Sequence, residues 1–130
     1  MASIFSKIVN GEIPAYKIAE TDDFLAFLDA FPLVKGHTLV IPKKEIDYIF
    51  DVNDELYSGL WQFSKVIAKA VKLAIPCQRI GVTVIGLEVP HAHIHLIPIQ
   101  RMDDMNFSKP KLNFSKEEME RIATSIRSKL

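Results

Sequence analysis

Three histidines that alternate with apolar residues form the most distinctive pattern in this chain. His91, His93 and His95 lie in the stretch HAHIHLIP and are three of the chain's four histidines. Successive side chains of a β-strand point to opposite faces, so a strand here places the three imidazoles on one side and the intervening apolar side chains in the core. Buried imidazole nitrogens need polar partners, so three rings are costly to bury for packing alone. The pattern therefore predicts a functional cluster of imidazoles.

Such a cluster allows three interpretations. The first is a structural, half-exposed ladder of histidines whose nitrogens are satisfied. The second is a metal centre, because two or three histidines at i, i+2 and i+4 on a strand can ligate zinc, and the fourth histidine, His37, can add a ligand. The third is nucleophilic catalysis on phosphorus. There, one imidazole attacks while a neighbouring imidazole carries positive charge or donates a proton.

The composition limits the kinds of partner that the chain can bind. Its 16 basic residues balance 16 acidic ones, so a broad nucleic-acid surface is not expected, whereas a small anionic ligand can still bind locally. The N-terminal segment lacks the apolar core of a signal peptide, and no run approaches the roughly 18 apolar residues of a membrane span. The single Cys77 excludes an intrachain disulfide and is expected to be buried. We therefore expect a cytoplasmic protein with one domain over residues 1–130.

Short elements are expected in the first third of the chain. A helix over residues 3–9 ends at an Asn-Gly pair, a common stop signal. Two segments, 15–20 and 24–28, flank a polar turn and predict a hairpin. The apolar run 38–41, bounded by a glycine and a proline, indicates a strand directly after His37. His37 reaches the face of the histidine strand if the two strands are neighbours.

The middle of the chain carries the clearest helix. Six apolar residues at alternating spacings of four and three form one stripe: Leu56, Leu60, Phe63, Ile67, Ala70 and Ala74. Asp54 and Glu55 lie at its start, as the helix dipole favours, and Pro76 ends it. The pattern predicts a long helix with one buried face.

Two strands and a last helix complete the expected fold. The strands are predicted over 80–85 and 93–97, and a surface loop follows over 98–114. The last helix begins at Ser115, which has capping-box spacing with Glu118. Its apolar face comprises Met119, Ile122, Ala123, Ile126 and Leu130. Together the elements predict an α+β domain with an antiparallel sheet of about five strands, one long central helix and a C-terminal helix.

At the histidine stretch the sequence resembles the histidine triad (HIT) superfamily, whose signature is His-x-His-x-His followed by apolar residues. Two further segments are similar to that family. IFSKIVNGEIPAYKI resembles its opening segment, and AFLDAFPLVKGHTLVIPKK resembles its central hairpin and strand. The resemblance is greatest to the histidine triad nucleotide-binding proteins, which are typically homodimers. It therefore implies a HIT-like fold and a homodimer.

The resemblance also implies a role for each histidine. His93, the middle one, would attack the α-phosphorus of a nucleoside 5′-phosphate derivative, such as a phosphoramidate or a dinucleoside polyphosphate. Water would then release the nucleoside monophosphate from a nucleotidyl-histidine intermediate. His91 and His95 would orient His93 and bind phosphate oxygens, and His37 would complete the cluster. The implied activity is that of a hydrolase or nucleotidyl transferase, for which we expect no cofactor.

A nucleotide site beside the histidines follows from the same resemblance. Asp29 matches the family's ribose-binding acid, and a carboxylate can accept from two vicinal hydroxyls. Six apolar residues match positions of the base pocket, where a purine would be buried: Ile4, Phe5, Ile8, Ile13, Phe27 and Leu28. The expected ligand is therefore a small nucleotide, a purine nucleoside phosphate.

Two segments depart from the family's pattern. Many members carry an Asn, a Gly-rich turn and a Gln or Ser just before the triad, where this chain has VTVIGLEVP. Only Gly86, Glu88 and backbone groups remain there to contact a phosphate. Some relatives hold zinc with N-terminal cysteines and histidines, but this chain has Ser3, Ser6 and Glu45 at those places, so no structural zinc is expected. The altered loop keeps an alternative open, a non-catalytic module that binds a nucleoside monophosphate, and a histidine-ligated metal enzyme is a third.

Overall fold

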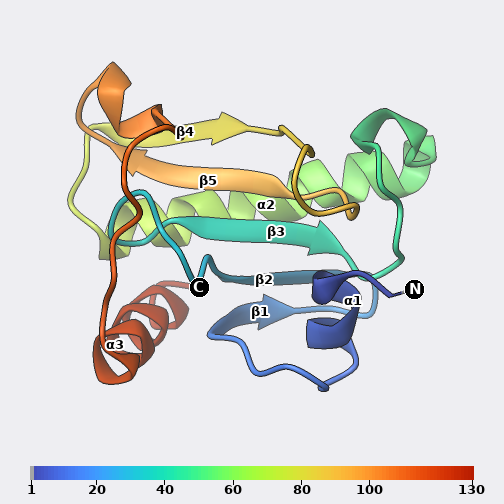
Figure 1. Ribbon diagram of the computed structural model, residues 1–130, viewed down its shortest axis with the longest axis horizontal. Helices are drawn as coiled ribbons and strands as arrows, with labels where there is room; N and C mark the ends of the chain where they lie inside the picture. Colours follow the sequence, from blue (N-terminus) through green and yellow to red (C-terminus); the bar gives the residue numbers. More distant parts are fainter. Residues whose placement is uncertain (1) are drawn as a thin grey trace.

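A five-stranded antiparallel sheet forms the centre of the computed structural model, which describes residues 2–130 (Figure 1). The strands lie in the spatial order β1-β2-β3-β5-β4, and each neighbouring pair is antiparallel. They are Lys17–Glu20 (β1), Phe24–Leu28 (β2), Thr38–Pro42 (β3), Arg79–Thr83 (β4) and Ile94–Ile99 (β5). The predicted α+β class and the predicted antiparallel sheet are confirmed.

Two helices cover one face of this sheet. The long helix α2 (Asp54–Ala74) lies behind the strands in Figure 1, and α3 (Lys116–Arg127) packs beside it. The Asn53 side chain caps α2 by accepting a hydrogen bond from the Leu56 amide at 2.9 Å. The predicted stripe faces the core: its buried members are Leu60, Ile67 and Ala70, and its other members pack at the core's edge. α3 begins at Ser115 with the predicted capping box.

The short helix α1 (Ile4–Val9) packs on the opposite face of the sheet. Strand β2 separates the two cores by the alternation of its side chains. Leu25 and Phe27 join Phe5 and Ile8 of α1, whereas Leu28 belongs to the core under α2 and α3. Two 3₁₀ turns, η1 (Ile49–Asp51) and η2 (Met102–Met105), lie in the connections before α2 and after β5. The sheet is thus packed on both faces, and the histidines lie on the side of α1.

Several sequence-based expectations are wrong in detail. Strand β4 ends at Thr83 rather than at residue 85, and β5 extends to Ile99, so the following loop begins later than residue 98. Leu130 was expected on the buried face of the last helix, but α3 ends at Arg127 and Leu130 is exposed. Cys77 is half-buried rather than buried, because it lies in the connection between α2 and β4. Strand β5 begins at Ile94, one residue later than predicted, so His91 and His93 precede it. No helix in the described range 2–130 has the length and apolar character to cross a membrane.

Candidate active site

The four histidines gather on the face of the sheet that carries α1. Strands β3 and β5 are neighbours, with Leu39 opposite His95. His37 directly precedes β3, and its Nε2 lies 2.9 Å from Nδ1 of His95. The centroids of the His93 and His95 rings are 4.9 Å apart, and those of the His93 and Phe5 rings are 5.0 Å apart. The prediction that His37 reaches the histidine strand is therefore confirmed.

The histidines differ in their access to solvent. His37 and His91 are enclosed, with exposed fractions of 1% and 0%, whereas His93 and His95 each keep 7%. A ligand that arrives from solvent therefore meets His93 and His95 first, and the other two imidazoles lie behind them.

A backbone carbonyl fixes the protonation of the His93 ring. Its Nδ1 lies 2.7 Å from the carbonyl oxygen of His91. A carbonyl oxygen only accepts, so Nδ1 of His93 carries the proton and donates it. In the neutral ring, Nε2 of His93 therefore keeps its lone pair and is available as a nucleophile.

The protonation of His37 determines that of His95. The Leu33 amide donates to Nδ1 of His37 at 3.0 Å, so the proton of this ring is on Nε2. That Nε2 then donates to Nδ1 of His95 at 2.9 Å. In its neutral form His95 therefore carries its proton on Nε2. Next to the lone pair of His93, the site thus presents an N–H donor on His95.

His91 makes hydrogen bonds through both ring nitrogens. Its Nε2 donates to the carbonyl oxygen of Pro42 at 2.8 Å, and its Nδ1 lies 2.8 Å from the hydroxyl oxygen of Ser3. Because the Nε2 proton goes to Pro42, Nδ1 accepts from Ser3. His91 therefore belongs to the scaffold of the cluster, and its carbonyl, rather than its ring, contacts His93.

Burial keeps the supporting histidines neutral at pH 7. Desolvation, with a smaller contribution from the His95 charge, lowers the pKa of His37 to about 3. Desolvation and the charge of His93 lower the pKa of His95 to about 4, and burial also lowers the pKa of His91. These directions agree with the single-proton hydrogen bonds above, because each supporting ring has one proton to donate and one lone pair to accept.

A model of the HIT domain matches residues 10–102 of the chain. The chain belongs to the HIT family. Its sequence is 36% identical to an uncharacterized HIT-like protein of Borreliella burgdorferi, with 95% of this chain and 94% of that protein covered. It is 35% identical to the adenosine 5′-monophosphoramidase of Schizosaccharomyces pombe, and the alignment covers 100% of this chain and 99% of that protein. The fold is similar to that in the crystal structure of a HIT-like protein involved in cell-cycle regulation from Bartonella henselae. The TM-score is 0.86 and the sequence identity 34%, with 98% of this chain and 96% of that chain covered.

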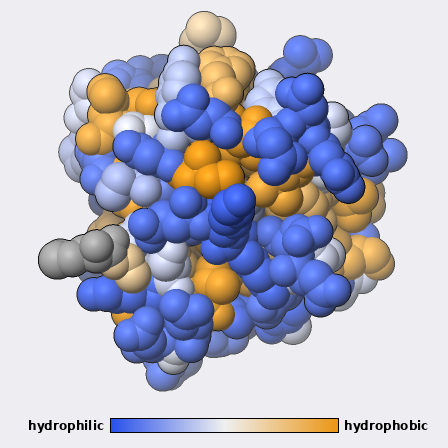
Figure 2. Space-filling view, turned by 90° about the vertical axis from the view of Figure 1, so that its right-hand side faces the viewer, coloured by the Kyte–Doolittle hydropathy of each residue, from blue (hydrophilic) through white to orange (hydrophobic). Residues whose placement is uncertain are grey.

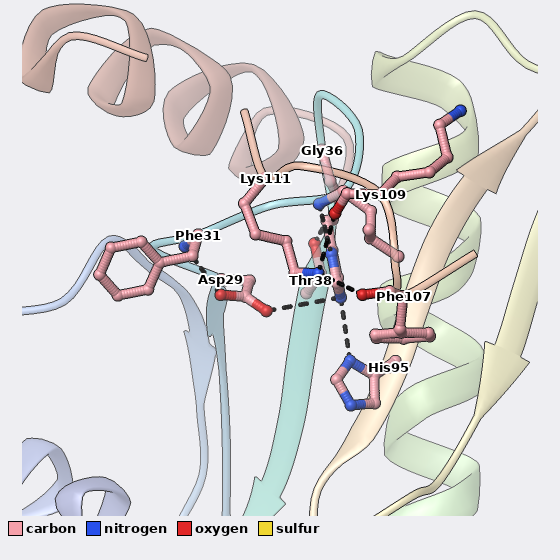
Figure 3. A network of polar contacts seen from close by, with 10 residues as sticks. Asp29, Phe31, Gly36, Thr38, His95, Phe107, Lys109 and Lys111 are labelled. Atoms are coloured by element: carbon pink, nitrogen blue, oxygen red, sulfur yellow. Dashed lines mark hydrogen bonds and ion pairs between the residues drawn. The ribbon is translucent and has the colours of Figure 1, made fainter. Parts of the chain in front are cut away.

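In this HIT protein, Asp29 lies beside the supporting histidines, directly after β2 (Figure 3). Its Oδ2 is 3.6 Å from Nε2 of His37, and its Oδ1 accepts from the Phe31 amide at 2.9 Å. Burial raises the pKa of Asp29, while the Phe31 hydrogen bond and the charge of His93 oppose that shift. Since His37 is neutral at pH 7, its contact with Asp29 is one between a carboxylate and an N–H dipole.

The same HIT cluster contains a candidate set of metal ligands. Asp29, His37 and His95 offer ligand atoms within 4.8 Å of one another. In the present geometry, however, Nε2 of His37 donates its proton to Nδ1 of His95, so each of these nitrogens is engaged by the other. The triad itself is not arranged as a ligand set either, because both nitrogens of His91 have other partners. The residues of this HIT site therefore fit a hydrogen-bonded network better than they fit a metal centre.

Four of the six residues expected in the base pocket lie together. Phe5, Ile8 and Phe27 are buried in one cluster, and Ile13 packs against it. The Phe5 ring, 5.4 Å from Phe27 and 5.0 Å from His93, connects this cluster to the HIT histidines. The other two residues lie elsewhere: Leu28 points into the opposite core, because it follows Phe27 on the strand, and Ile4 is 49% exposed.

The loop before the HIT triad carries the two other residues singled out from the sequence. Gly86 has φ 76°, in the left-handed region that favours glycine, and a Cβ there would meet nothing within 4 Å. Glu88 is exposed, and its charge is a small contribution to the raised pKa of Asp29. Leu87 is 88% exposed.

Figure 2, which views the N-terminal side of the molecule, shows apolar surface in small areas between hydrophilic side chains.

Two residues that the sequence analysis did not identify complete this HIT site. The Phe107 ring lies edge-on to His95 at 5.0 Å and to His37 at 6.2 Å. The ammonium of Lys111 donates to the carbonyl of Phe107 at 2.7 Å, and its charge acts on both Asp29 and His37 (Figure 3). Both residues come from the aperiodic stretch after β5, where no spacing signal points to a site. Only the path of the folded chain brings them to the histidines.

Proposed function

We propose that this HIT protein hydrolyses or transfers at the α-phosphorus of nucleoside 5′-phosphate derivatives, with His93 as the nucleophile. One observation carries the proposal: Nδ1 of His93 donates to the His91 carbonyl, which leaves the Nε2 lone pair free on a ring at the surface of the site. A relative 35% identical over the whole chain is named an adenosine 5′-monophosphoramidase, which supports this class of substrate.

The first step forms a bond between Nε2 of His93 and the α-phosphorus, while the bond from phosphorus to the leaving group breaks. The leaving group departs with the electron pair and takes up a proton from solvent, which the second step returns. The His93 ring becomes cationic, and the His91 carbonyl that accepts from Nδ1 stabilises that charge. In this proposal the Nε2–H of His95 donates to a phosphoryl oxygen.

The second step returns the enzyme to its starting state. Water attacks the phosphorus of the nucleotidyl-histidine, the P–N bond breaks, and its electron pair returns to Nε2 of His93. The products are a nucleoside monophosphate and the free imidazole, and the proton from water leaves to solvent. A transfer reaction differs only in that another nucleophile replaces the water.

Asp29 and the cluster around Phe5 supply the nucleoside contacts of the proposed complex. The Asp29 carboxylate accepts from the ribose hydroxyls, and the base packs against the cluster of Phe5, Ile8 and Phe27. A purine suits this cluster, because a bicyclic base buries the most apolar surface.

Mass spectrometry tests the covalent step directly. The protein is mixed with adenosine phosphoramidate, quenched in acid-free denaturant and compared with His93→Ala. We expect an adduct of one adenylyl group on wild-type protein at residue 93 and none on the variant. An adduct of equal amount on both proteins would overturn the assignment of His93.

The loop before the triad favours a second candidate function. The stretch between β4 and His91 offers a phosphate only Gly86, backbone groups and the carboxylate of Glu88. Such a loop suits a module that binds a nucleoside monophosphate without reacting. Retained binding of AMP together with no adduct and no turnover would establish that candidate instead.

We also propose that the protein is a homodimer joined along β4. This strand lies at an edge of the sheet. Val82 in the strand and Ile85 and Leu87 just after it are apolar and exposed. An edge strand with apolar side chains is a ready template for pairing. Light scattering is expected to give twice the chain mass of 14.7 kDa, and a monomer at micromolar concentrations would contradict the proposal.

A further inference from the structure

A second polar cluster lies behind the histidines and joins three parts of the chain. Ser3 caps the N-terminus of α1 and Ser6 lies within that helix, while Glu45 follows β3 and His91 precedes β5. Glu45 Oε1 accepts from the Ser3 amide at 2.6 Å and from the Ser6 hydroxyl at 2.7 Å. The Ser3 hydroxyl is 2.8 Å from Nδ1 of His91. The exposed carboxylate is thus connected to a fully enclosed imidazole through one serine.

The direction of each proton in this cluster is determined. Nδ1 of His91 is an acceptor, because Nε2 donates to Pro42. The Ser6 hydroxyl, 3.5 Å from that Nδ1, gives its proton to Glu45 at the shorter distance of 2.7 Å. The Ser3 hydroxyl accepts from the Ser6 amide at 2.9 Å and donates its own proton to His91. Ser3 is therefore the donor that satisfies the buried Nδ1 of His91.

The consequence extends to His93 through the backbone of His91. The His91 ring is held between Pro42 on one side and Ser3 on the other. Its carbonyl accepts the Nδ1 proton of His93 at 2.7 Å. Without the Ser3 hydroxyl, the ring at position 91 loses a buried hydrogen bond. If its proton moves to Nδ1, the ring can donate to the Ser6 hydroxyl oxygen, 3.5 Å away, but it then loses the bond to Pro42, so the two tautomers become closer in free energy.

We propose that Ser3, held in place by Glu45, is a positioning residue that fixes the ring of His91 and, through the His91 carbonyl, the orientation of His93. The inference rests on the proposed function only in assigning the nucleophile to His93. It adds Ser3 and Glu45, which lie outside the triad, to the residues on which kcat depends.

The experiment must separate this role from helix capping, because Ser3 also caps α1. Ser115 provides a matched control: its hydroxyl accepts from the amide of Glu118 at 3.1 Å, as Ser3 accepts from that of Ser6, and it caps α3. Ser3→Ala and Ser115→Ala therefore remove the same kind of cap, but only the first removes a donor to a histidine.

Nitrogen-15 NMR of the histidine rings gives a readout that a capping role would not change. In wild-type protein we expect His91 with its proton on Nε2 alone. In Ser3→Ala we expect a mixture of the two tautomers and a kcat about tenfold lower, a loss of about 1.4 kcal/mol in transition-state stabilisation. Ser3→Thr keeps the hydroxyl, so it should retain the wild-type His91 tautomer and the wild-type kcat. Ser115→Ala should change neither the His91 tautomer nor kcat.

Two further variants keep the outcome decisive. Glu45→Ala changes an exposed side chain, so it tests the cluster even if Ser3→Ala does not fold, and it is expected to shift the His91 signals in the same direction. Unchanged His91 signals or an unchanged kcat in both Ser3→Ala and Glu45→Ala would overturn the inference. The ring signals need no turnover, so a failure of His93→Ala to abolish activity would refute the proposed function separately.

Discussion

Nδ1 of His93 lies 2.7 Å from the carbonyl oxygen of His91, two residues earlier in the chain. This contact decides which nitrogen of the neutral His93 ring carries the proton and which keeps its lone pair, because a carbonyl can only accept. It also places a partial negative charge behind the ring, where it would stabilise the cation of the proposed nucleotidyl-histidine intermediate.

The stability of the protein is expected to fall as the pH decreases from 7 to 5. His37 and His95 have folded-state pKa values of about 3 and about 4, well below the value of about 6.5 for an unfolded chain. In this window the unfolded chain takes up protons that the folded protein does not, so the free energy of unfolding decreases. Urea midpoints at pH 7, 6 and 5 measure the effect. His37→Phe should flatten the dependence, and equal midpoints at pH 7 and 5 would contradict the neutral histidines.

Asp29→Asn is expected to raise KM for a ribonucleotide substrate about tenfold, as the loss of a charged acceptor for two hydroxyls requires. Asparagine keeps an oxygen for the Phe31 amide, so the turn at Asp29 is preserved. The same variant should no longer distinguish a ribonucleotide from its 2′,3′-dideoxy analogue. If wild-type protein binds the two analogues equally, Asp29 does not contact the ribose.

Phe5→Leu is expected to weaken binding of adenine nucleotides severalfold, because the ring that lies 5.0 Å from His93 and 5.4 Å from Phe27 is lost. Phe24→Leu is the matched control: Phe24 stacks on Phe63 at 5.6 Å at the edge of the opposite core. Calorimetric titration with AMP compares the two. Equal losses of affinity in both variants would indicate a general effect on packing and no base pocket at Phe5.

Lys111→Met is expected to raise KM for an anionic substrate. The fold-change in KM should be several times larger than the fold-decrease in kcat. The supporting histidines are neutral at pH 7, so the Lys111 ammonium supplies positive charge near Asp29 and His37. Two backbone carbonyls hold it, whereas Lys109 is paired with Asp103 at 3.0 Å. Lys109→Met therefore serves as the control. Similar KM values for the two variants would show that Lys111 does not attract the substrate.

Periodicity predicted α2 and α3 well because each of these helices buries one apolar stripe, whereas β3, which is buried along its length, was predicted from its short apolar run. The alternation along β2 would also have assigned Leu28 to the core opposite Phe27. Similarity to the family placed Leu28 in the pocket instead, and the strand geometry overrides that placement. The geometry of His91 was not readable from the sequence, because its ring direction depends on Pro42 and Ser3, which are distant along the chain.

The contributions of the C-terminal segment also required the structure. Phe107 and Lys111 lie in a stretch with no period, and their position over the histidines depends on long-range contacts such as that between the Leu112 amide and the Pro32 carbonyl, at 2.8 Å. The position of His37 was predictable, because a residue directly before β3 must lie near β5 once the two strands pair.

The most direct test of the central claim is the release of AMP from adenosine phosphoramidate and from diadenosine polyphosphates, measured for wild-type protein and His93→Ala side by side. We predict turnover by wild type and a loss of at least about a thousandfold in the variant, as the removal of a covalent nucleophile requires. AMP should still bind to the variant, because Asp29 and the Phe5 cluster are unchanged. Equal turnover by the two proteins would contradict His93 as the nucleophile.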